Sequence, residues 1–471
     1  MRTVLLVLGM AVVAVVAMLT DNAALVLGML AVGTAAVFAA RSYVVLILGY
    51  SILPTIPIAI PGTFLTPFIV ATPVAMAAAL WHYRGKWHEL SPPRAYLVPL
   101  VLLVLLTMLS ELATPYTALI NPIINLAGAL VVGVLVNAII RTDKDMRLMS
   151  LAVLANLLLM AGSAASELNW AEMQIDQVRV SGLAGEPNVL GIHLGRMVPV
   201  AAAILFERDF KLWQRGLAAI ALGLGALSLI GCASRTGAVA VAVSLLALTV
   251  AGARSLRTKA FGGGAAVLTF ALLMYFSPAS FQTRVLEPAG LARGTTLDIN
   301  KSDVTSGRLD QLPHAFELMN LHPVLGVGTS GYATESANHF TGLATALHNA
   351  YLSVPVAYGV LAGLVFIFAI VASVIVGFRA IRHSAYPLLT AAVASGALST
   401  AVALTAYPEP FRGWIWLVFV LPHAFMRVSS RRQAAEMAVA PVRPAKPQPP
   451  TWSGEPPPAR LAVAKGAPPL V

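Results

Sequence analysis

Cysteine and charge are the two things this sequence has least of. Cys232 is the only cysteine among 471 residues, which excludes an intrachain disulfide and a multi-cysteine metal site, and leaves packing as its expected role. Charged residues make up only 11% of the chain, while hydrophobic residues make up 58%. A water-soluble domain of this length needs far more charge on its surface, whereas helices that face lipid need almost none. The composition therefore indicates an integral membrane protein.

Several familiar enzyme signatures are missing as well. The sequence contains no Walker A phosphate-binding loop, no H-E-x-x-H pair and no G-x-S-x-G turn. A nucleotide-driven pump and a zinc protease are therefore disfavoured. An enzyme that works on the outer side of a membrane has no ATP to use, so we expect its energy to arrive with the substrate.

Long apolar runs occupy most of the chain. Runs of roughly 16 to 25 residues are long enough to cross the hydrocarbon layer as helices, and they are continuous rather than alternating, which favours helices over a β-barrel. The sequence therefore predicts an all-α polytopic membrane protein with about 12–14 transmembrane helices. The predicted runs are 3–19, 23–40, 42–60, 64–81, 96–112, 117–140, 148–165, 188–206, 216–231, 238–252, 260–276, 350–377, 387–405 and 413–426.

Lys and Arg recur in the loop after every second predicted helix. The positive-inside rule places these loops in the cytoplasm, and with them both ends of the chain. The 166–187 loop and the long polar segment 277–346 then lie on the opposite, outer side. The basic loops that carry this argument are 82–95, 141–147, 208–215, 254–259 and 379–382.

These patterns divide the chain into five predicted parts. The parts are a transmembrane hairpin (1–40), a transmembrane core (41–276), a large outer catalytic loop (277–346), C-terminal transmembrane helices (347–426) and a tail (427–471). The tail contains ten of the 31 prolines and no apolar period, so we expect it to be disordered and close to the anionic inner face of the membrane.

Arg308 lies in the outer loop, just before a predicted helix. Asp310 is the expected N-cap of that helix, and an apolar stripe of Leu312, Phe316 and Met319 runs along it. An arginine beside a helix N-terminus can bind phosphate, because free N–H groups and the guanidinium converge on the same oxygens. The alternative is a solvated arginine at a bend in the loop.

His348 and Asn349 stand where the chain re-enters the membrane. A histidine at such a position can accept a proton from a hydroxyl near neutral pH. The alternative is that His348 only marks the membrane interface and donates to a backbone carbonyl.

Three further residues carry charge or polarity at unusual places. Arg235 lies in a tight outer turn, where arginine is uncommon, so it needs either a carboxylate or an anionic substrate as its partner. His193 and Arg196 are three residues apart within the run 188–206 and share one face inside the membrane, where polar groups usually face a cavity.

Two outer turns contain weaker candidates. Glu186 and Asn188 flank the proline that begins the run 188–206, and Glu409 lies in the last outer turn. We expect these residues, with Asn349, His193 and Arg196, to line one substrate-binding cleft.

Taken in order, five short motifs on the outer side resemble the O-antigen ligase and polymerase superfamily of bacterial envelope glycan assembly. The likeness covers roughly residues 160–365. Its motifs are Gly182 with Pro187-Asn188, Ser234-Arg235-Thr236, Arg308 with Leu312, His322-Pro323 with Gly326 and Gly328, and His348-Asn349 with Gly359. Two features depart from the family: Ala362 stands where a glycine is usual, and the helix count exceeds 12.

The resemblance implies a GT-C-like membrane fold and a metal-independent, inverting glycosyl transfer that needs no cofactor. An undecaprenyl-diphosphate-linked glycan would be the donor, with Arg235 and Arg308 holding the diphosphate leaving group. His348 would orient or deprotonate the acceptor hydroxyl. The resemblance also implies a place in the bacterial inner membrane, with membrane lipids and a glycan or lipid acceptor as partners, and no nucleic acid.

Three functions remain open at the level of sequence. A ligase uses lipid A-core or a protein hydroxyl as acceptor, whereas a polymerase joins a second lipid-linked repeat unit. The Arg-x-x-x-Leu and His-Asn motifs favour a ligase. The third alternative is a flippase or transporter for the same lipid-linked material, to which only His193 and Arg196 point.

Overall fold

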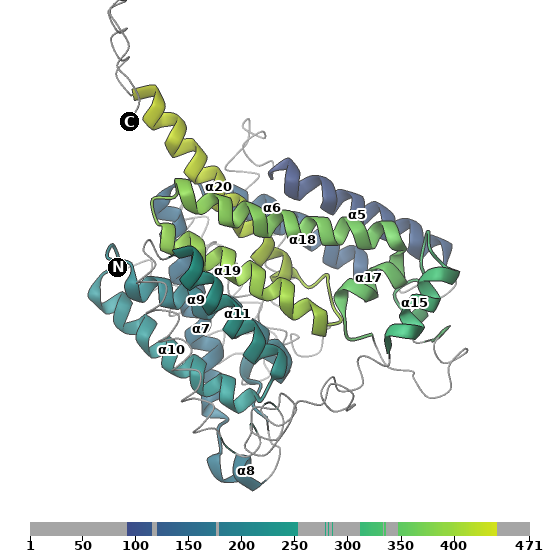
Figure 1. Ribbon diagram of the computed structural model, residues 1–471, viewed down its shortest axis with the longest axis horizontal. Coiled ribbons are helices and arrows are strands. Elements are labelled where there is room, and N and C mark those ends of the chain that lie inside the picture. Colours follow the sequence, from purple (N-terminus) through teal and green to yellow (C-terminus); the bar gives the residue numbers. More distant parts are fainter. Residues whose placement is uncertain are drawn as a thin grey trace, which may run out of the picture. The chain divides into compact units, whose positions relative to one another are not determined.

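The structure, a computed structural model, describes residues 92–114, 120–175, 179–252, 278, 281, 285, 311–332, 334–335 and 347–439. Within these ranges the chain is helical and has no strand (Figure 1). Seven of the helices are long and apolar enough to cross a membrane. The chain is therefore an all-α polytopic membrane protein, as its composition predicts.

Each apolar run predicted between residues 96 and 252 corresponds to one helix of the described part. Runs predicted at 3–19, 23–40, 42–60, 64–81 and 260–276 lie outside the described residues, as does the hairpin 1–40, so the total number of helices stays a prediction. The helices before the outer loop are α5 (Arg94–Ala113), α6 (Ile120–Ile139), α7 (Asp143–Ser166), α8 (Trp170–Ile175), η3 (Gly182–Ala184), α9 (Pro187–Phe206), α10 (Leu212–Cys232) and α11 (Arg235–Gly252). From the loop onward they are α15 (Gln311–Leu321), α17 (Ala350–Tyr358), α18 (Val360–Ala380), η5 (Ile381–His383), α19 (Pro387–Ala403), η6 (Leu404–Ala406) and α20 (Gly413–Val439).

Local signals explain where two of these helices begin. Thr142 and Asp145 form a capping box at the start of α7: the Thr142 side chain accepts from the Asp145 N–H, and the Asp145 carboxylate accepts from the Thr142 N–H at 2.8 Å. Pro187 occupies the first turn of α9, where a missing N–H costs nothing.

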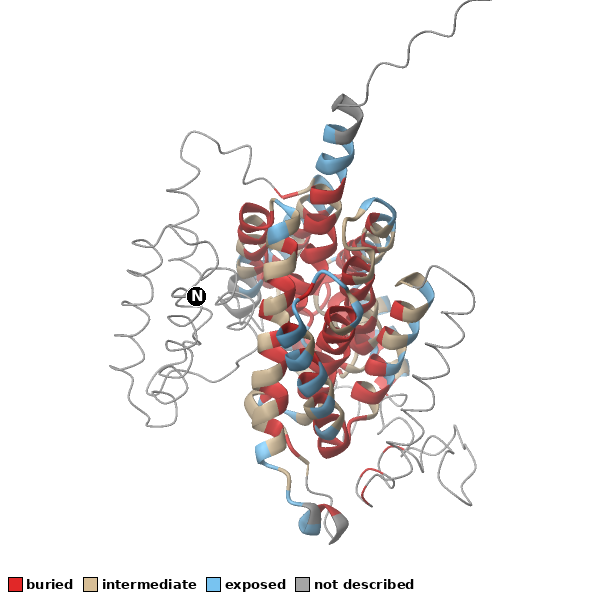
Figure 2. Ribbon diagram, turned by 90° about the vertical axis from the view of Figure 1, so that its left-hand side faces the viewer, coloured by how far each residue is buried: buried red, intermediate tan, exposed pale blue. Residues whose placement is uncertain are grey.

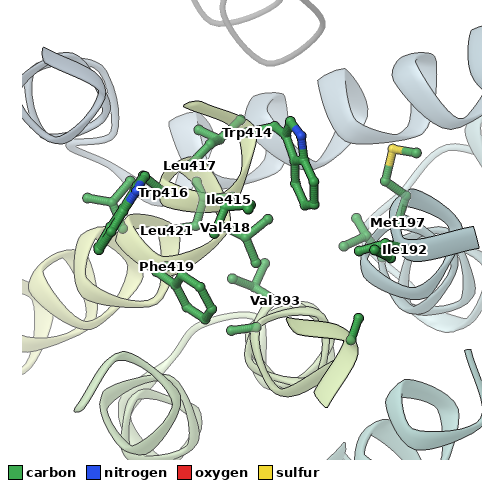
Figure 3. Packing of buried hydrophobic residues seen from close by; sticks show 14 of the residues in the cluster. Ile192, Met197, Val393, Trp414, Ile415, Trp416, Leu417, Val418, Phe419 and Leu421 are labelled. Carbon is green, nitrogen blue, oxygen red and sulfur yellow. The ribbon is translucent and has the colours of Figure 1, made fainter. Parts of the chain in front are cut away.

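Helices α9 and α20 form the centre of the core. Every residue from Val189 to Ile204 of α9 is buried, and so is every residue from Trp414 to Phe425 of α20. Helix α9 packs against α7, α10, α11 and α19, and buried residues lie along the inside of the bundle (Figure 2). Figure 3 shows side chains of α20 facing Ile192 and Met197 of α9 and Val393 of α19. The helix with His193 and Arg196 is thus enclosed by protein rather than lipid.

Small residues allow α9, α11 and α19 to approach closely. A Cβ on Gly191 would lie 2.7 Å from the Cα of Gly237, and a Cβ on Gly195 would lie 2.5 Å from the Ser399 hydroxyl. That hydroxyl donates to the Ala240 carbonyl at 2.8 Å. Close backbone approach of this kind stabilises helix pairs in membranes, where hydrophobic burial adds little.

Two predicted boundaries differ from the structure. The run predicted at 350–377 is two helices, because the chain breaks at Gly359, whose φ is 88°. Helix α20 continues to Val439, past the predicted end at 426, so the first residues of the predicted tail are helical. The chain forms one unit up to Ser430; of the second unit, from Arg431 onward, only residues 431–439 are described. The disorder expected further along the tail lies outside the described residues.

Because successive long helices run in opposite directions, the segments that connect them lie at two opposite ends of the bundle. The turns at 140–142, 207–211 and 381–386 join helices at one end of the bundle, and they carry basic residues. The segments 167–186, 233–234, 347–349 and 404–412 join helices at the other end. Four of the candidate residues, Glu186, His348, Asn349 and Glu409, belong to this second set, and Asn188 and Arg235 follow it within two residues.

Candidate functional site

Asn188 joins the start of α9 to the turn between α10 and α11. Its Oδ1 accepts from Arg179 Nη2 at 3.0 Å and from the Ser234 hydroxyl at 3.1 Å, and its Nδ2 donates to Glu186 Oε1 at 3.3 Å. Arg179 also donates from Nε to the Cys232 carbonyl at 2.8 Å, which satisfies a free carbonyl at the end of α10. Asn188 therefore positions its neighbours, and the prediction that it also contacts substrate stays a prediction.

Arg235 is the first residue of α11 and is partly buried. The Ser234 hydroxyl before it accepts from the Gly237 N–H at 3.1 Å, as an N-cap does. Ala233 makes the sharp turn between the two helices with a positive φ of 44°. Helix α11 thus has a guanidinium beside its N-terminal N–H groups, at the end of the bundle predicted to be outer, and this combination suits an anion.

Glu409 forms part of a compact polar turn with Tyr407 and Arg412. The Tyr407 hydroxyl donates to Glu409 Oε2 at 2.9 Å, and Arg412 Nη2 donates to Glu409 Oε1 at 2.9 Å while its Nε pairs with Oε2. Burial raises the pKa of Glu409, but the hydrogen bonds and charge of Arg412, with the Tyr407 hydroxyl, outweigh burial and hold the pKa below its ordinary value. Glu409 is thus an ionised carboxylate engaged with its own turn.

Glu186 and Glu409 both act on Tyr407. Burial raises the pKa of the Tyr407 phenol, Glu409 raises it further, and Glu186 makes the smallest contribution in the same direction. Two of the predicted substrate-binding residues therefore affect the same tyrosine.

His348 and Asn349 lead into α17. The Asn349 side chain caps this helix by accepting from the Tyr351 N–H at 3.0 Å. The His348 N–H donates to Gln311 Oε1 at 3.2 Å, which ties the start of α17 to the start of α15. The His348 imidazole is partly exposed.

Helix α17 is held to the turn that contains Glu409. The Tyr351 hydroxyl donates to the Ala401 carbonyl at 2.7 Å, and the Ser353 hydroxyl donates to the Pro408 carbonyl at 3.3 Å. The structure therefore brings the His348 helix beside the 404–412 turn.

His193 and Arg196 share a face of α9, as their spacing predicts, and both meet Trp414. The His193 ring lies edge-on to the Trp414 ring at a centroid distance of 4.6 Å, and the Arg196 guanidinium lies 5.1 Å from the same ring. Arg196 Nη1 donates to the Trp414 carbonyl at 3.1 Å. The two residues are only 0% and 7% exposed, so they lie inside the bundle rather than on its surface.

A cavity of about 40 Å³ lies beside Arg196, between α7, α9, α19 and α20. Its lining is apolar except for Ser150, Asn156 and Arg196. A water molecule needs about 10–15 Å³ of such space and at least two polar partners, so the cavity is large enough to hydrate the guanidinium. Water here would lower the cost of a charged side chain inside the membrane.

The glycine-rich motif after α15 packs on the break between α17 and α18. Val327 N–H donates to the Val356 carbonyl at 2.9 Å, and Gly328 N–H donates to the Ala357 carbonyl at 2.8 Å. A Cβ on Gly326 would lie 2.4 Å from Ala357, and one on Gly359 would lie 2.0 Å from the Val324 carbonyl. These glycines are thus required for packing. Helix α15 ends at Leu321, just before His322-Pro323.

A buried carboxylate, Glu111, fixes this motif to α5. Glu111 is fully buried, and its Oε1 accepts from the Thr329 N–H at 3.0 Å and from the Thr329 hydroxyl. The Thr329 hydroxyl lies 2.9 Å from the Tyr358 hydroxyl, so one polar group joins α5, the motif and α17. The Ser110 hydroxyl adds a bond to the Ala357 carbonyl at 2.9 Å.

Arg308 and its expected N-cap Asp310 lie outside the described residues. The predicted stripe of Leu312, Phe316 and Met319 is not the buried face of α15, because Phe316 is 54% exposed and the buried residues are Gln311, Ala315 and Leu318. Within the described part of the chain, no group of three or more His, Cys, Asp or Glu side chains could hold a metal ion.

Comparison with known protein families indicates the type of enzyme to which the chain is similar. The O-antigen ligase family model matches residues 218–367, from α10 into α18, a range that contains Arg235, Arg308 and His348. Residues 218–367 therefore match an O-antigen ligase domain, and this match supports membership of the O-antigen ligase superfamily. The chain is therefore a membrane enzyme of the O-antigen ligase or polymerase type. No curated protein matches the chain.

Sequence reasoning did not single out three residues that connect this region. Tyr407 and Arg179 lie next to residues that were singled out, and only their hydrogen bonds show their importance. Glu111 had a recognisable signal, because it is a carboxylate inside an apolar run and such residues usually mark functional or tightly packed positions.

Proposed function

We propose that this protein transfers a glycan from undecaprenyl diphosphate to an acceptor hydroxyl on the outer side of the bacterial inner membrane, as an O-antigen ligase does. The acceptor oxygen attacks the anomeric carbon and the bond from that carbon to the diphosphate breaks. Configuration at the anomeric carbon is inverted, and no metal ion takes part. The observation that carries the proposal is the gathering of Arg235, Glu186, Glu409 and the His348 helix at one end of the bundle.

The leaving group determines the role of the arginines. A departing diphosphate gains negative charge, and cationic or N–H donors already in place stabilise it in the transition state. Arg235 stands at the start of α11, where the helix dipole acts in the same direction as the guanidinium. Arg308 precedes Gln311 by three residues, and three residues of chain span at most about 11 Å. The Gln311 side chain accepts a hydrogen bond from the His348 N–H, and we propose that Arg308 acts with His348 on the same substrate.

The acceptor determines the role of His348. Its imidazole is partly exposed at the start of α17, so it can reach a hydroxyl that approaches from the outer side. It accepts the proton that the hydroxyl loses as the new bond forms. General-base help of this kind contributes about 10²–10⁴-fold in rate.

The decisive experiment is transfer in vitro. Purified protein is supplied with a defined undecaprenyl-diphosphate glycan and with lipid A-core, a protein acceptor or a second lipid-linked repeat unit, one at a time, with and without EDTA. Product with lipid A-core or protein, unaffected by EDTA and of inverted configuration by NMR, is the expected result. Product only with the second repeat unit would identify a polymerase. Movement of labelled carrier lipid across vesicles without sugar transfer would identify a flippase instead.

A deletion strain gives an independent answer. Long but unattached glycan chains are expected for a ligase, whereas single repeat units would show that the protein is the polymerase. Both measurements read the glycan itself and depend on no assumption about His348.

A further inference from the structure

The segment Leu321–Val324, here called the knuckle, presents apolar side chains at the protein surface. It joins the end of α15 to the glycine-rich motif. Leu321 is 57% exposed and Val324 is 72% exposed. The knuckle contains no Asp, Glu, Lys or Arg. An exposed apolar corner in an outer loop indicates a partner.

The knuckle lies directly on the first turn of α18. The Val360 N–H donates to the Pro323 carbonyl at 2.9 Å, and Gly359 approaches the Val324 carbonyl so closely that a Cβ would lie 2.0 Å from it. The first two turns of α18 expose Val360, Leu361 and Leu364 by 41%, 54% and 60%. The apolar surface of α18 therefore begins where the knuckle is attached.

The length of α18 fixes the depth of this junction in the bilayer. The helix has no charged residue between Val360 and Arg379. Nineteen residues of helix rise about 28 Å, close to the roughly 30 Å of a hydrocarbon core. With Arg379 at the inner boundary, Val360 lies at the outer boundary, and so does the knuckle.

Helix α5 gives the same depth independently. It runs from Arg94 to Ala113, and 20 residues of helix also rise about 30 Å. Gly328 lies against Thr114 at its outer end, where a Cβ would be 2.6 Å from the threonine hydroxyl. Leu109 and Leu112 expose 55% and 69% of their surfaces beside this end. Two membrane helices thus place the glycine-rich motif, and the knuckle before it, at the outer edge of the hydrocarbon layer.

We propose that the knuckle is seated in the outer leaflet, with Leu321 and Val324 in contact with lipid acyl chains. The exposed side chains of the knuckle adjoin the apolar, lipid-facing surfaces of α5 and α18. The acyl chains that cover those two helices therefore cover the knuckle as well. The outer loop is then anchored to the bilayer at the base of α15. This anchoring is independent of the reaction proposed above and would hold for a ligase or a polymerase alike.

Spin-label accessibility tests this position directly. Single cysteines are introduced by Leu321→Cys and Val324→Cys in a Cys232→Ala background, labelled with a nitroxide and measured in nanodiscs with oxygen and a nickel chelate as relaxants. Leu364→Cys on α18 is the lipid control. Glu317→Cys, an exposed position on α15, is the water control. Since all four side chains are exposed, the labels leave the core unchanged.

The expected result is that labels at 321 and 324 respond to oxygen and little to nickel, as the label at 364 does. A response like that at 317 would overturn the proposal by placing the knuckle in water. Protection from both relaxants would overturn it too, because a protein surface would then cover the knuckle. Transfer activity of the same variants reports on the reaction separately, so failure of one proposal leaves the other testable.

Discussion

His348 and Asn349 are neighbours in sequence and differ in their surroundings. The Asn349 side chain is committed to the first turn of α17, whereas the imidazole of His348 is partly exposed. We propose that Asn349 shapes the site as a helix cap and that His348 accepts the proton. Sequence alone assigns both to the site without separating their roles.

His348→Ala is expected to lower transfer by about 10²–10⁴-fold while the protein still inserts and accumulates, because a general base is lost and no helix cap is. The measurement is glycan transfer per amount of membrane-inserted protein. Asn349→Ala is the matched control: loss of an N-cap costs about 1 kcal/mol, so it should lower the melting temperature, and Asn349→Asp should restore it. Normal transfer by a stable His348→Ala variant would show that the histidine is not the general base.

Glu409 contributes stability that depends on pH. Its pKa is held below the ordinary value in the folded state, so its contribution is present above the unfolded pKa of about 4.3 and is lost as pH falls through the lower folded pKa. The Glu409 and Arg412 side chains are each 46% exposed, so solvent screens the pair and its contribution is below about 1 kcal/mol.

Glu409→Gln should therefore lower the melting temperature slightly at pH 7 and by less near pH 3, as the pH approaches the lowered folded pKa of Glu409. The measurement is thermal unfolding in detergent at several pH values. Glu172→Gln, an exposed carboxylate on α8, provides the control. A Glu409→Gln effect that is the same at both pH values would show that the charge of the carboxylate is not what stabilises the turn.

At the scale of elements, the junction of the glycine-rich motif with α17 and α18 requires glycine at particular positions. Gly326, Gly328 and Gly359 all have φ between 67° and 88°, a region that costs other residues about 1–2 kcal/mol. The backbone contacts at Gly326 and Gly359 leave no room for a methyl group. The spacing of these glycines is therefore a packing requirement of the fold.

Gly359→Ala should lower the yield of folded protein and destabilise it by more than about 2 kcal/mol, since strain in φ adds to a clash with the Val324 carbonyl. Fluorescence-detected size exclusion and thermal unfolding measure both effects. Gly223→Ala is the control, because a Cβ at Gly223 of α10 meets nothing within 4 Å. That change should be neutral or stabilising by up to about 1 kcal/mol. Equal behaviour of the two variants would contradict the packing argument.

Glu111 connects α5, the glycine-rich motif and α17, and we expect it to stabilise their packing. Glu111→Ala leaves the Thr329 N–H and hydroxyl without their acceptor, which costs about 1–3 kcal/mol for buried donors. We expect reduced transfer and faster proteolysis of the outer loop in membranes, with insertion unchanged. Glu111→Gln keeps one acceptor oxygen and should recover much of both. If alanine and glutamine variants lose transfer equally while proteolysis is unchanged, the carboxylate has a chemical role instead.

For the whole molecule, the basic connections predict how the bundle is oriented in the membrane. Arg141, Lys144 and Arg147 lie at one end of the bundle, and Glu186 and Arg235 at the other. The positive-inside rule then predicts that the glycan reaches the protein from outside the cell membrane.

Cysteine labelling in intact spheroplasts tests this orientation. Glu186→Cys should react with a membrane-impermeant maleimide, whereas Lys144→Cys should react only after the membrane is opened. Native Cys232 is fully buried and should stay unlabelled in both cases. Labelling of Lys144→Cys from outside would invert the topology and remove the basis for a reaction on that side.

The apolar periodicity predicted each membrane helix between residues 96 and 252, because the length of a helix that crosses lipid is fixed by the bilayer and its composition by the cost of exposing polar groups. The same physics could not locate the break at Gly359, where apolar residues continue on both sides of the turn. It also placed the apolar stripe of α15 on a face that is not the buried one.

The sequence by itself determined the class of protein, the membrane helices and the order of the motifs, since these depend on local composition and spacing. Only the tertiary structure decided which candidates meet. It placed Glu409 at Tyr407 and Glu186 at Asn188, made Asn349 the cap of α17, buried His193 and Arg196 against Trp414, and joined Glu111 to Thr329 across 218 positions. These pairings depend on how helices pack side by side, and no local pattern records which distant residue will be the neighbour.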